Sequence, residues 1–286
     1  MLDETQITGQ TKGSDQFRIL ESDSYDPTHL TRVLDGEILG FKVQNFVSDK
    51  DCHTIYDNFE NYAGRYQRGA DAPAIYAGTY HYGKDLSQYF ADSEQANVTL
   101  PKLFTNAANP VAKIRETLTD HLQKRSQHFR SAQWNGQDAC QFVMRAWTDM
   151  GTFSLKPHDD EAQCNDSKQS GFEIQDAIAE NPLCAVNICL RNGPGGLLRM
   201  WNIRPDDLTR KRLGLETTGS PYPPEMLADI AHIDIKIAPG DLYAFDGRYV
   251  HAVTQLEDIA GQANASRATL AFLLAHKDRF ETIQWS

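Results

Sequence analysis

The second half of the chain alternates between short runs rich in apolar residues and turns rich in glycine, proline and aspartate. Such runs of about four to eight residues, bounded by turn residues, are typical of β-strands. The turns include Asp149–Met150–Gly151, the NGPGG stretch at 192–196 and Pro239–Gly240–Asp241. About eight strands are expected, which is typical of a double-sheet jelly roll. The expected strands are residues 140–148, 152–160, 185–192, 197–203, 232–239, 241–247, 248–256 and 267–277.

Length and composition suit one domain built around these strands. The chain has 286 residues, a length that single β barrels reach undivided, and 40% of its residues are hydrophobic, enough to build a core. We therefore expect a mainly β fold with flanking helices, namely a cupin-like double-stranded β-helix, or jelly roll. The expected parts are a flexible lead-in over 1–30 and a single domain over 31–286, with a helical layer at 31–135 and the jelly-roll core at 136–286.

Several helices are expected outside the strands. Ser48 is a good N-cap, and the acidic residues that follow it favour a helix running to about Tyr62. Apolar residues at three- and four-residue steps predict a second helix over 111–127. Two insertions interrupt the strands: the first contains a possible helix over Phe172–Ala179, and the second, at 204–231, is rich in proline.

One short run carries the residue types of a metal site. His158 and Asp160 stand at the end of the second expected strand, where residues two apart point to the same face. A second histidine, His251, lies far downstream on another expected strand. Two histidines and one carboxylate suit Fe(II) and leave one face of the metal open. Asp159 is expected to face away and is the rival ligand if the register differs.

Arginines on two other expected strands are candidates for binding carboxylates. Arg267 opens the last strand, and alternation places Thr269 on the same face, where its hydroxyl could add a hydrogen bond. A guanidinium is the natural partner for the far carboxylate of a dicarboxylic co-substrate. Arg145 lies inside an apolar run of the first strand. Either it faces the pocket and holds a carboxylate of co-substrate or substrate, or it pairs with a neighbouring acid.

Aromatic residues supply candidates for a substrate pocket. Residues 64–92 are rich in tyrosine and interrupted by glycine and proline, so one regular element is not expected there. The segment suits either a pocket wall or lid, with Tyr80 and Tyr82 contacting the substrate, or a surface loop packed on the barrel. Trp201 is a core residue by default and is also a candidate for contacting the substrate.

Charge, hydropathy and cysteine content exclude some classes of function. The formal net charge of −11 argues against nonspecific binding to nucleic acid, which requires clustered lysine and arginine. No apolar run approaches the length that spans a membrane, and the polar, acidic N-terminal segment is neither a secretory signal nor a transit peptide. The five cysteines include no CxxC pair, so a reducing cytoplasm is the expected location.

Three stretches resemble one enzyme family: MRAWTDMGTFSLKPHDDEAQ at 144–163, GPGGLLRMWNIRP at 193–205 and IYAGTYHYGKDLSQYFADS at 75–93. They are similar to the Fe(II)/2-oxoglutarate dioxygenases, and most similar to the freestanding bacterial branch of aliphatic halogenases and N-substituted amino-acid hydroxylases. The resemblance implies Fe(II), 2-oxoglutarate and O2 as cofactors, with Arg267 holding the co-substrate. In the halogenases glycine replaces the metal-binding carboxylate, so Asp160 implies hydroxylation.

The sequence thus predicts an oxygenase that hydroxylates an unactivated C–H bond of a small molecule, an amino-acid derivative or a specialised metabolite, and releases succinate and CO2. Two alternatives stay open. A cupin-like hydrolase or isomerase could use the same three ligands with another metal and would not need Arg267. A noncatalytic metal-binding jelly roll would need neither an open coordination site nor a lid.

Overall fold

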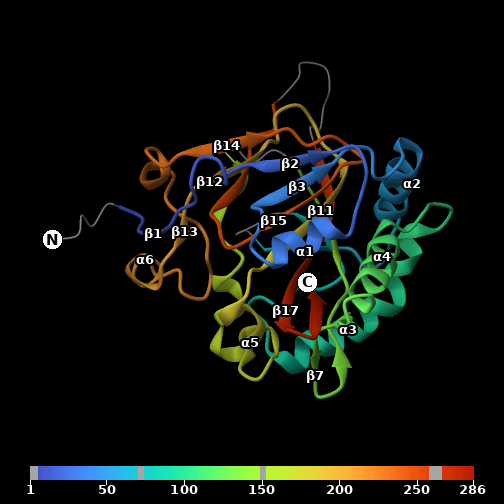
Figure 1. The fold of residues 1–286 in the computed structure, drawn as a ribbon. Coiled ribbons are helices and arrows are strands. Elements are labelled where there is room, and N and C mark those ends of the chain that lie inside the picture. Colours follow the sequence, from blue (N-terminus) through green and yellow to red (C-terminus); the bar gives the residue numbers. More distant parts are fainter. Residues whose placement is uncertain (1–5, 70–73, 149–152, 258–265) are drawn as a thin grey trace.

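Eight strands form the two antiparallel sheets of a jelly roll in the computed structural model, which describes residues 6–69, 74–148, 153–257 and 266–286 (Figure 1). The expected turn Asp149–Met150–Gly151 lies outside the described residues. Every one of the eight expected strands is confirmed. The larger sheet contains, in spatial order, β15 (Leu242–Asp246), β11 (Cys184–Arg191), β17 (Ser266–Asp278) and β9 (Val143–Thr148). The smaller sheet contains β10 (Phe153–His158), β16 (His251–Thr254), β12 (Leu198–Trp201) and β14 (His232–Ile235).

Further strands widen the larger sheet on both sides. They are β2 (Ile19–Ser22), β3 (Gly40–Val43), β4 (Tyr66–Gln67), β5 (Ile75–Ala77), β6 (His128–Ser131) and β18 (Glu281–Trp285). Two more pairs stand apart from it: β1 (Gly9–Gln10) with β13 (Arg204–Pro205), and β7 (Gln133–Trp134) with β8 (Gln137–Asp138). The chain therefore places extra strands around the eight that the sequence marks clearly.

The segment expected to be a flexible lead-in is part of the fold from residue 6 onward. β1 pairs with β13, and β2 runs parallel to β3 at the edge of the larger sheet. Ile7 and Phe17 are buried and anchor this segment. Its composition is polar because an edge strand is held mainly by backbone hydrogen bonds, which a hydropathy pattern does not reveal. The expectation of a free segment over 1–30 is corrected for these described residues.

Helices pack against the larger sheet, and most of them precede β9. They are α1 (Thr28–Leu34), α2 (Asp49–Glu60), α3 (Leu86–Thr99), α4 (Pro110–Gln123) and α5 (Ile174–Glu180). A further helix, α6 (Asp207–Leu213), lies between β12 and β14, and Leu213 at its end packs in a separate cluster with Trp201. In Figure 1 α2, α3 and α4 lie together on the right of the molecule. Their apolar faces and the larger sheet share one continuous core that includes Phe59, Phe90 and Trp285. This layer holds the barrel strands in place from outside and leaves the space between the sheets for the site.

All three helix predictions hold, including the possible helix over Phe172–Ala179, which is α5, whereas α1, α3 and α6 were not predicted. Ser48 caps α2, its hydroxyl accepting a hydrogen bond from the Asp51 backbone N–H at 3.1 Å. The helix expected over 111–127 is α4, with its apolar residues buried. α3 begins inside the tyrosine-rich segment, and its N-cap, Asp85, makes no side-chain capping bond. Without a capping signal, its tyrosines resembled an irregular stretch.

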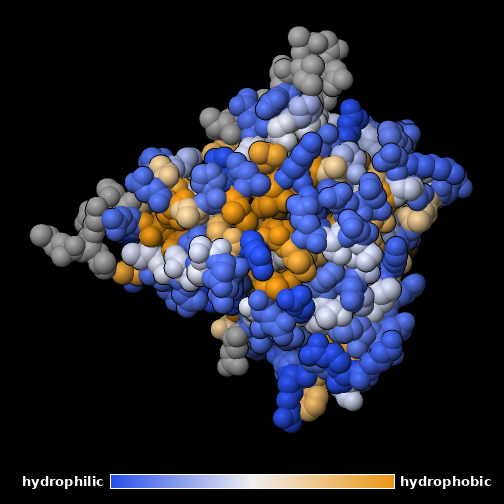
Figure 2. Space-filling model, turned by 45° about the horizontal axis from the view of Figure 1, so that its top comes forward, coloured by the Kyte–Doolittle hydropathy of each residue, from blue (hydrophilic) through white to orange (hydrophobic). Residues whose placement is uncertain are grey.

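The surface is hydrophilic over most of its area, in keeping with the net charge of −11. Figure 2 shows one face on which apolar side chains gather near the centre and polar side chains surround them. Within the described part of the chain, no helix combines the length and the apolar character required to cross a membrane.

Candidate metal centre and its cavity

Two histidines lie side by side at the paired ends of β10 and β16 in the smaller sheet. His158 is the last residue of β10 and His251 is the first residue of β16. The two strands are antiparallel and place these residues directly opposite each other. Their ring centroids are 4.1 Å apart. Residues that are 93 positions apart in sequence are therefore cross-strand neighbours.

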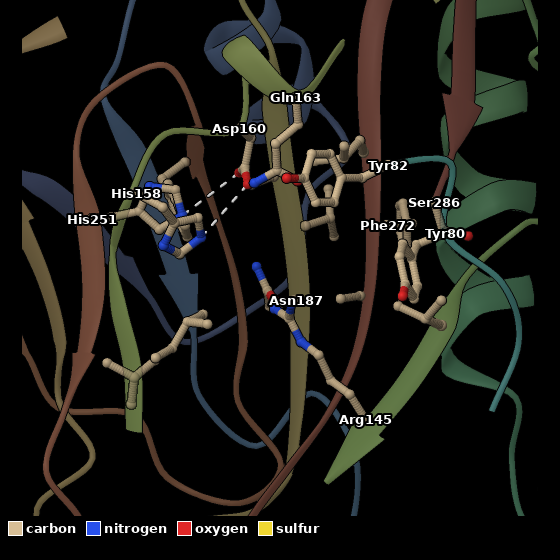
Figure 3. A pocket seen from close by; sticks show the side chains of 18 of the residues that line it. Tyr80, Tyr82, Arg145, His158, Asp160, Gln163, Asn187, His251, Phe272 and Ser286 are labelled. Carbon is tan, nitrogen blue, oxygen red and sulfur yellow. Dashed lines mark hydrogen bonds and ion pairs between the residues drawn. The ribbon is translucent and has the colours of Figure 1, made fainter. Parts of the chain in front are cut away.

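The carboxylate of Asp160 completes the group (Figure 3). Its Oδ1 lies 3.7 Å from His158 Nε2 and its Oδ2 lies 3.6 Å from His251 Nε2. One potential ligand atom from each residue lies within 4.8 Å of the other two. Asp160 follows the end of β10, so a turn places it rather than strand alternation: its backbone N–H donates to the Gly247 carbonyl at 2.8 Å. A Cβ at Gly247 would lie 2.6 Å from Asp160 Oδ2, so this position requires glycine.

Both imidazoles are in the neutral form, with a free lone pair on Nε2, that metal binding requires. Each Nδ1 lies within hydrogen-bond distance of a backbone carbonyl two residues earlier, at 2.8 Å for His158 and 2.9 Å for His251. That contact places the proton on Nδ1 and leaves Nε2 as an acceptor. Burial, together with the neighbouring His251, lowers the pKa of His158 to about 3, and burial lowers the pKa of His251 to about 4.

The atoms that face one another, Nε2 of the two histidines and the carboxylate oxygens of Asp160, are therefore all acceptors. Two imidazole lone pairs and a carboxylate, brought together away from water, repel unless a cation lies between them. A set of two neutral nitrogens and one anionic oxygen suits Fe(II) and leaves coordination positions free for small molecules. The residues present fit the metal that the sequence predicted.

A cavity opens beside the three side chains, with about 780 Å³ of empty space that includes its opening to solvent, and it is lined from both sheets and from the tyrosine-rich segment. The smaller sheet contributes His158, His251, Leu198 and Val253, and the larger sheet contributes Arg145, Asn187 and Tyr243. Tyr76, Tyr80 and Tyr82 form an aromatic wall. Gln163, from the first insertion, lies next to Asp160 (Figure 3). The cavity thus joins a metal-binding end to a polar, partly basic interior.

Arg145 is one of two arginines that line this cavity, the other being Arg68. Its Nε donates to Thr269 Oγ1 at 3.2 Å and its Nη2 donates to Asn187 Oδ1 at 3.1 Å. Arg145 and Thr269 are cross-strand partners on β9 and β17. Among the described residues, no carboxylate forms an ion pair with Arg145, so the structure shows the orientation toward the pocket and not the pairing with a neighbouring acid.

Arg267 lies deeper than expected. It is fully buried and does not line the cavity. Its Nη1 donates to the Gly196 carbonyl at 2.7 Å and its Nη2 donates to the Tyr243 hydroxyl at 2.9 Å, while its Nε has no partner among the described residues. Tyr243 lines the cavity, so Arg267 contacts the site indirectly, through its hydrogen bond to the Tyr243 hydroxyl.

The aromatic candidates divide into two groups. Tyr80 and Tyr82 line the cavity as expected. Trp201 does not, which corrects its assignment as a substrate contact: its ring packs 6.3 Å from that of Phe153 in a separate core cluster. On β12, Leu198 faces the cavity, so alternation turns Trp201 to the opposite face.

Sequence reasoning missed several cavity residues: Arg68, Tyr76, Gln163, Asn187 and Tyr243. A signal was available for two of them. Asn187, like Arg145, is a polar residue inside a buried strand. Tyr243 and Phe245 are two residues apart on β15 and therefore share its inner face. Arg68, Tyr76 and Gln163 stand in edge strands or insertions, where no strand periodicity identifies the inner face.

Comparison with known proteins adds the following. A family model described as carrier-protein-independent halogenase WelO5 matches residues 19–286. An L-isoleucine 3(1)-dioxygenase of Pantoea ananatis (strain AJ13355) is 32% identical over 171 residues, which are 59% of this chain and 55% of that protein. The chain thus matches about half the length of this curated relative.

Solved structures agree on the fold. An N-substituted L-amino acid dioxygenase from Burkholderia ambifaria AMMD superposes with a TM-score of 0.60 at 14% identity, covering 91% of each chain. The structure of an N-substituted L-amino acid dioxygenase in complex with alpha-KG, also from Burkholderia ambifaria AMMD, gives a TM-score of 0.56 at 14% identity and covers 91% of this chain and 90% of the other. At this identity the likeness concerns the fold alone.

Proposed function

The chain belongs to the carrier-protein-independent halogenase WelO5 family, and we propose from this that it is an Fe(II)/2-oxoglutarate-dependent oxygenase that hydroxylates a small molecule. One observation carries the proposal. Three acceptor groups converge at one end of a cavity, and the guanidinium of Arg145 faces the same cavity without an ion-pair partner among the described residues. A metal chelated by a 2-oxo acid and a cation for the far carboxylate require this combination.

We propose His158, Asp160 and His251 as the metal ligands. Bound Fe(II), with 2-oxoglutarate and O2, supplies the oxidising chemistry that inserts oxygen into a C–H bond and converts 2-oxoglutarate to succinate and CO2. The chain's own contribution is geometric: backbone carbonyls fix the tautomer of each histidine, and the turn at Gly247 fixes the carboxylate. The cavity walls orient the substrate and exclude water.

For the co-substrate, we propose that Arg145 binds the far carboxylate directly and that Thr269 holds the guanidinium in place. Arg267 supports the same end of the cavity through the Tyr243 hydroxyl. A guanidinium that is pre-oriented by a side-chain acceptor loses little conformational freedom on binding, which favours binding of a carboxylate at this position.

We propose hydroxylation rather than halogenation because Asp160 occupies the carboxylate position of the triad. Its two oxygens lie 3.7 and 3.6 Å from the two histidine Nε2 atoms. A protein carboxylate in that position leaves no ligand vacancy for a halide beyond those that the co-substrate and O2 require. Membership of a family described by a halogenase therefore does not assign halogenation to this chain.

For the substrate, we propose an amino-acid derivative that carries a carboxylate. Arg68 is the second cation of the cavity; it lies 4.3 Å from the Tyr80 ring centroid and donates to the Tyr76 hydroxyl at 3.0 Å. If Arg145 holds the co-substrate and Asp160 holds the metal, Arg68 remains to receive an anionic group of the substrate. The relatives named for isoleucine and for N-substituted amino acids are consistent with such a group.

Succinate release tests this proposal. We expect the Fe(II)-loaded protein to release succinate with a subset of amino acids and N-substituted amino acids, and to release much less with the carboxamide of the best substrate. Arg68→Met should raise KM for the acid and should leave the poor reaction with the carboxamide unchanged. Succinate release that no acid of this class stimulates would exclude the substrate proposal.

We further propose a cytoplasmic enzyme that acts on free small molecules rather than on nucleic acid.

A further inference from the structure

Three consecutive acids follow β10, and they point in different directions. Asp160 faces the two histidines, whereas Asp159 and Glu161 face away from them into the protein. Asp159 is 0% exposed and Glu161 is 7% exposed. Two buried carboxylates beside a metal ligand are costly unless they are paired.

Asp159 uses both of its carboxylate oxygens. Oδ1 accepts hydrogen bonds from the Ala162 backbone N–H at 2.9 Å and from Arg210 Nη2 at 3.1 Å. Oδ2 accepts a hydrogen bond from the Tyr222 hydroxyl at 2.7 Å. A carboxylate held by three donors cannot turn toward the histidines without leaving those donors unsatisfied.

Glu161 is held by the same arginine and by one more. Its Oε2 accepts from Arg210 Nη2 at 2.6 Å, and Arg204 forms a two-pronged contact with it, with distances of 2.6 and 3.2 Å. Arg210 is 4% exposed, so it bridges Asp159 and Glu161 inside the protein. Two guanidinium groups thus compensate the two outer carboxylates, and the middle carboxylate remains for another cation.

The side-chain donors to Asp159 and Glu161 all come from one segment outside the eight barrel strands. Residues 204–231 connect β12 to β14 and contain α6. The same segment lies against the acidic turn through its backbone: the Asp159 N–H donates to the Gly219 carbonyl at 3.0 Å, and the Tyr222 N–H donates to the Pro157 carbonyl at 2.9 Å. A Cβ at Gly219, whose φ is +58°, would lie 2.3 Å from the Asp159 carbonyl oxygen.

We propose that segment 204–231 is a clamp that positions Asp160 for the metal, with Arg210 and Tyr222 as its positioning residues. Arg210 holds the two outer acids away from the histidines, so that one carboxylate of three reaches the metal. Without it, Asp159 or Glu161 would lose its buried partner and turn toward the bound cation, which changes the coordination of the metal. This inference rests on the proposed function, because it assumes that the three residues bind a metal.

Calorimetric titration of the metal-free protein with MnCl2, without co-substrate, tests the clamp. Arg210→Met should raise the Kd for Mn(II) by about tenfold or more, the range expected for partners that orient metal ligands. Tyr222→Phe, which keeps the buried ring, should raise the Kd by a smaller factor. Lys211→Met is the matched control: it removes a cation from the exposed side of the same helix and should leave the Kd unchanged.

The outcomes are distinguishable. Wild-type protein that does not bind Mn(II) would remove the proposed function and the clamp with it. Wild-type binding with an unchanged Kd in Arg210→Met would overturn the clamp alone, even if the variant melts at a lower temperature, because a purely structural role lowers stability without changing the affinity of the folded protein. If Arg210→Met does not fold, Tyr222→Phe decides, and an unchanged Kd in that variant overturns the proposal.

Discussion

Asp160 is the residue on which the type of chemistry depends. The two histidines place their Nε2 atoms next to its carboxylate, and a side chain in place of Gly247 would collide with that carboxylate. Because no other acid in the described part of the chain joins the group, the position of one side chain sets the number of metal positions that stay open. The family model is described by a halogenase, whereas the curated relative is named as a dioxygenase.

Replacing Asp160 with glycine should therefore abolish hydroxylation. We expect Asp160→Gly to reduce substrate-dependent succinate release by about a hundredfold or more, since even partners that only orient metal ligands contribute about 10–100-fold. Product analysis with and without chloride measures the outcome. Asp57→Asn, which removes an exposed acid of α2, serves as the control. Full hydroxylation by Asp160→Gly would show that a different carboxylate binds the metal.

His81 predicts a dependence of stability on pH. It is buried, its Nδ1 lies 2.8 Å from Gln169 Oε1, and burial lowers its pKa to about 4. The unfolded chain takes up this proton near pH 6.5. Between these two values the unfolded state binds more protons, so the free energy of unfolding falls as the pH falls through this window.

Urea unfolding of the metal-free protein at pH 7 and pH 5 tests that statement. Wild-type protein should lose about 2 kcal/mol more free energy of unfolding over this interval than His81→Asn, which keeps a donor for Gln169 and does not titrate there. The comparison concerns the change with pH, so any overall loss of stability in the variant cancels. Equal losses in the two proteins would contradict a neutral, buried His81.

At the scale of elements, two neighbouring strands build the basic end of the cavity. β9 supplies Arg145, and β17 supplies Thr269 directly opposite it and Arg267 two residues away. Cross-strand pairing thus sets the distance between the two arginines, and alternation turns all three side chains inward. Of these two arginines, Arg145 lines the cavity and Arg267 lies behind Tyr243.

This arrangement predicts unequal effects on co-substrate binding. Arg145→Gln should raise the Kd for 2-oxoglutarate by about tenfold to a hundredfold, because a charged hydrogen bond contributes about 1.5–3 kcal/mol. Arg267→Gln and Tyr243→Phe should have smaller effects of similar size. Arg199→Gln is the control, since Arg199 pairs with Asp234 on the other face of β12. A larger effect at Arg267 than at Arg145 would place the far carboxylate at Arg267 itself.

The barrel was predictable from sequence because its strands are short, apolar and separated by turn residues. The metal group was predictable because His158 and His251 stand at the ends of such strands. Trp201 was misassigned because adjacent residues of a strand face opposite sides, so an error of one position moves a side chain from the core to the cavity. Asp160 does point toward the histidines, but the reason given for this from the sequence was incomplete: strand alternation ends at His158, and a turn places Asp160.

Other features could not be predicted because they depend on contacts between distant segments. β1 is held by β13, nearly two hundred residues away, and its own sequence carries no strand pattern. Arg210 lies in a short helix of an insertion, where an arginine is ordinarily a surface residue, and only the folded chain places it between Asp159 and Glu161. Polar contacts of this kind leave no periodicity in the sequence.

At the scale of the whole molecule, the jelly roll brings together groups from four parts of the chain. The smaller sheet and the turn after it supply the proposed metal ligands, the larger sheet supplies the arginine for the co-substrate, and the tyrosine-rich segment closes the cavity with an aromatic wall. The helices cover the outer face of the larger sheet and leave its inner face to the site. The family match extends over nearly the whole of this assembly, residues 19–286.

Titration of the Fe(II)-loaded protein with 2-oxoglutarate in the absence of O2 tests the central claim most directly. The account predicts a weak visible absorption band that grows with 2-oxoglutarate and saturates at one equivalent, that is absent in His158→Ala, and that requires a higher concentration of 2-oxoglutarate in Arg145→Gln. A protein that binds Fe(II) at this site but stays colourless at every concentration of 2-oxoglutarate would contradict it.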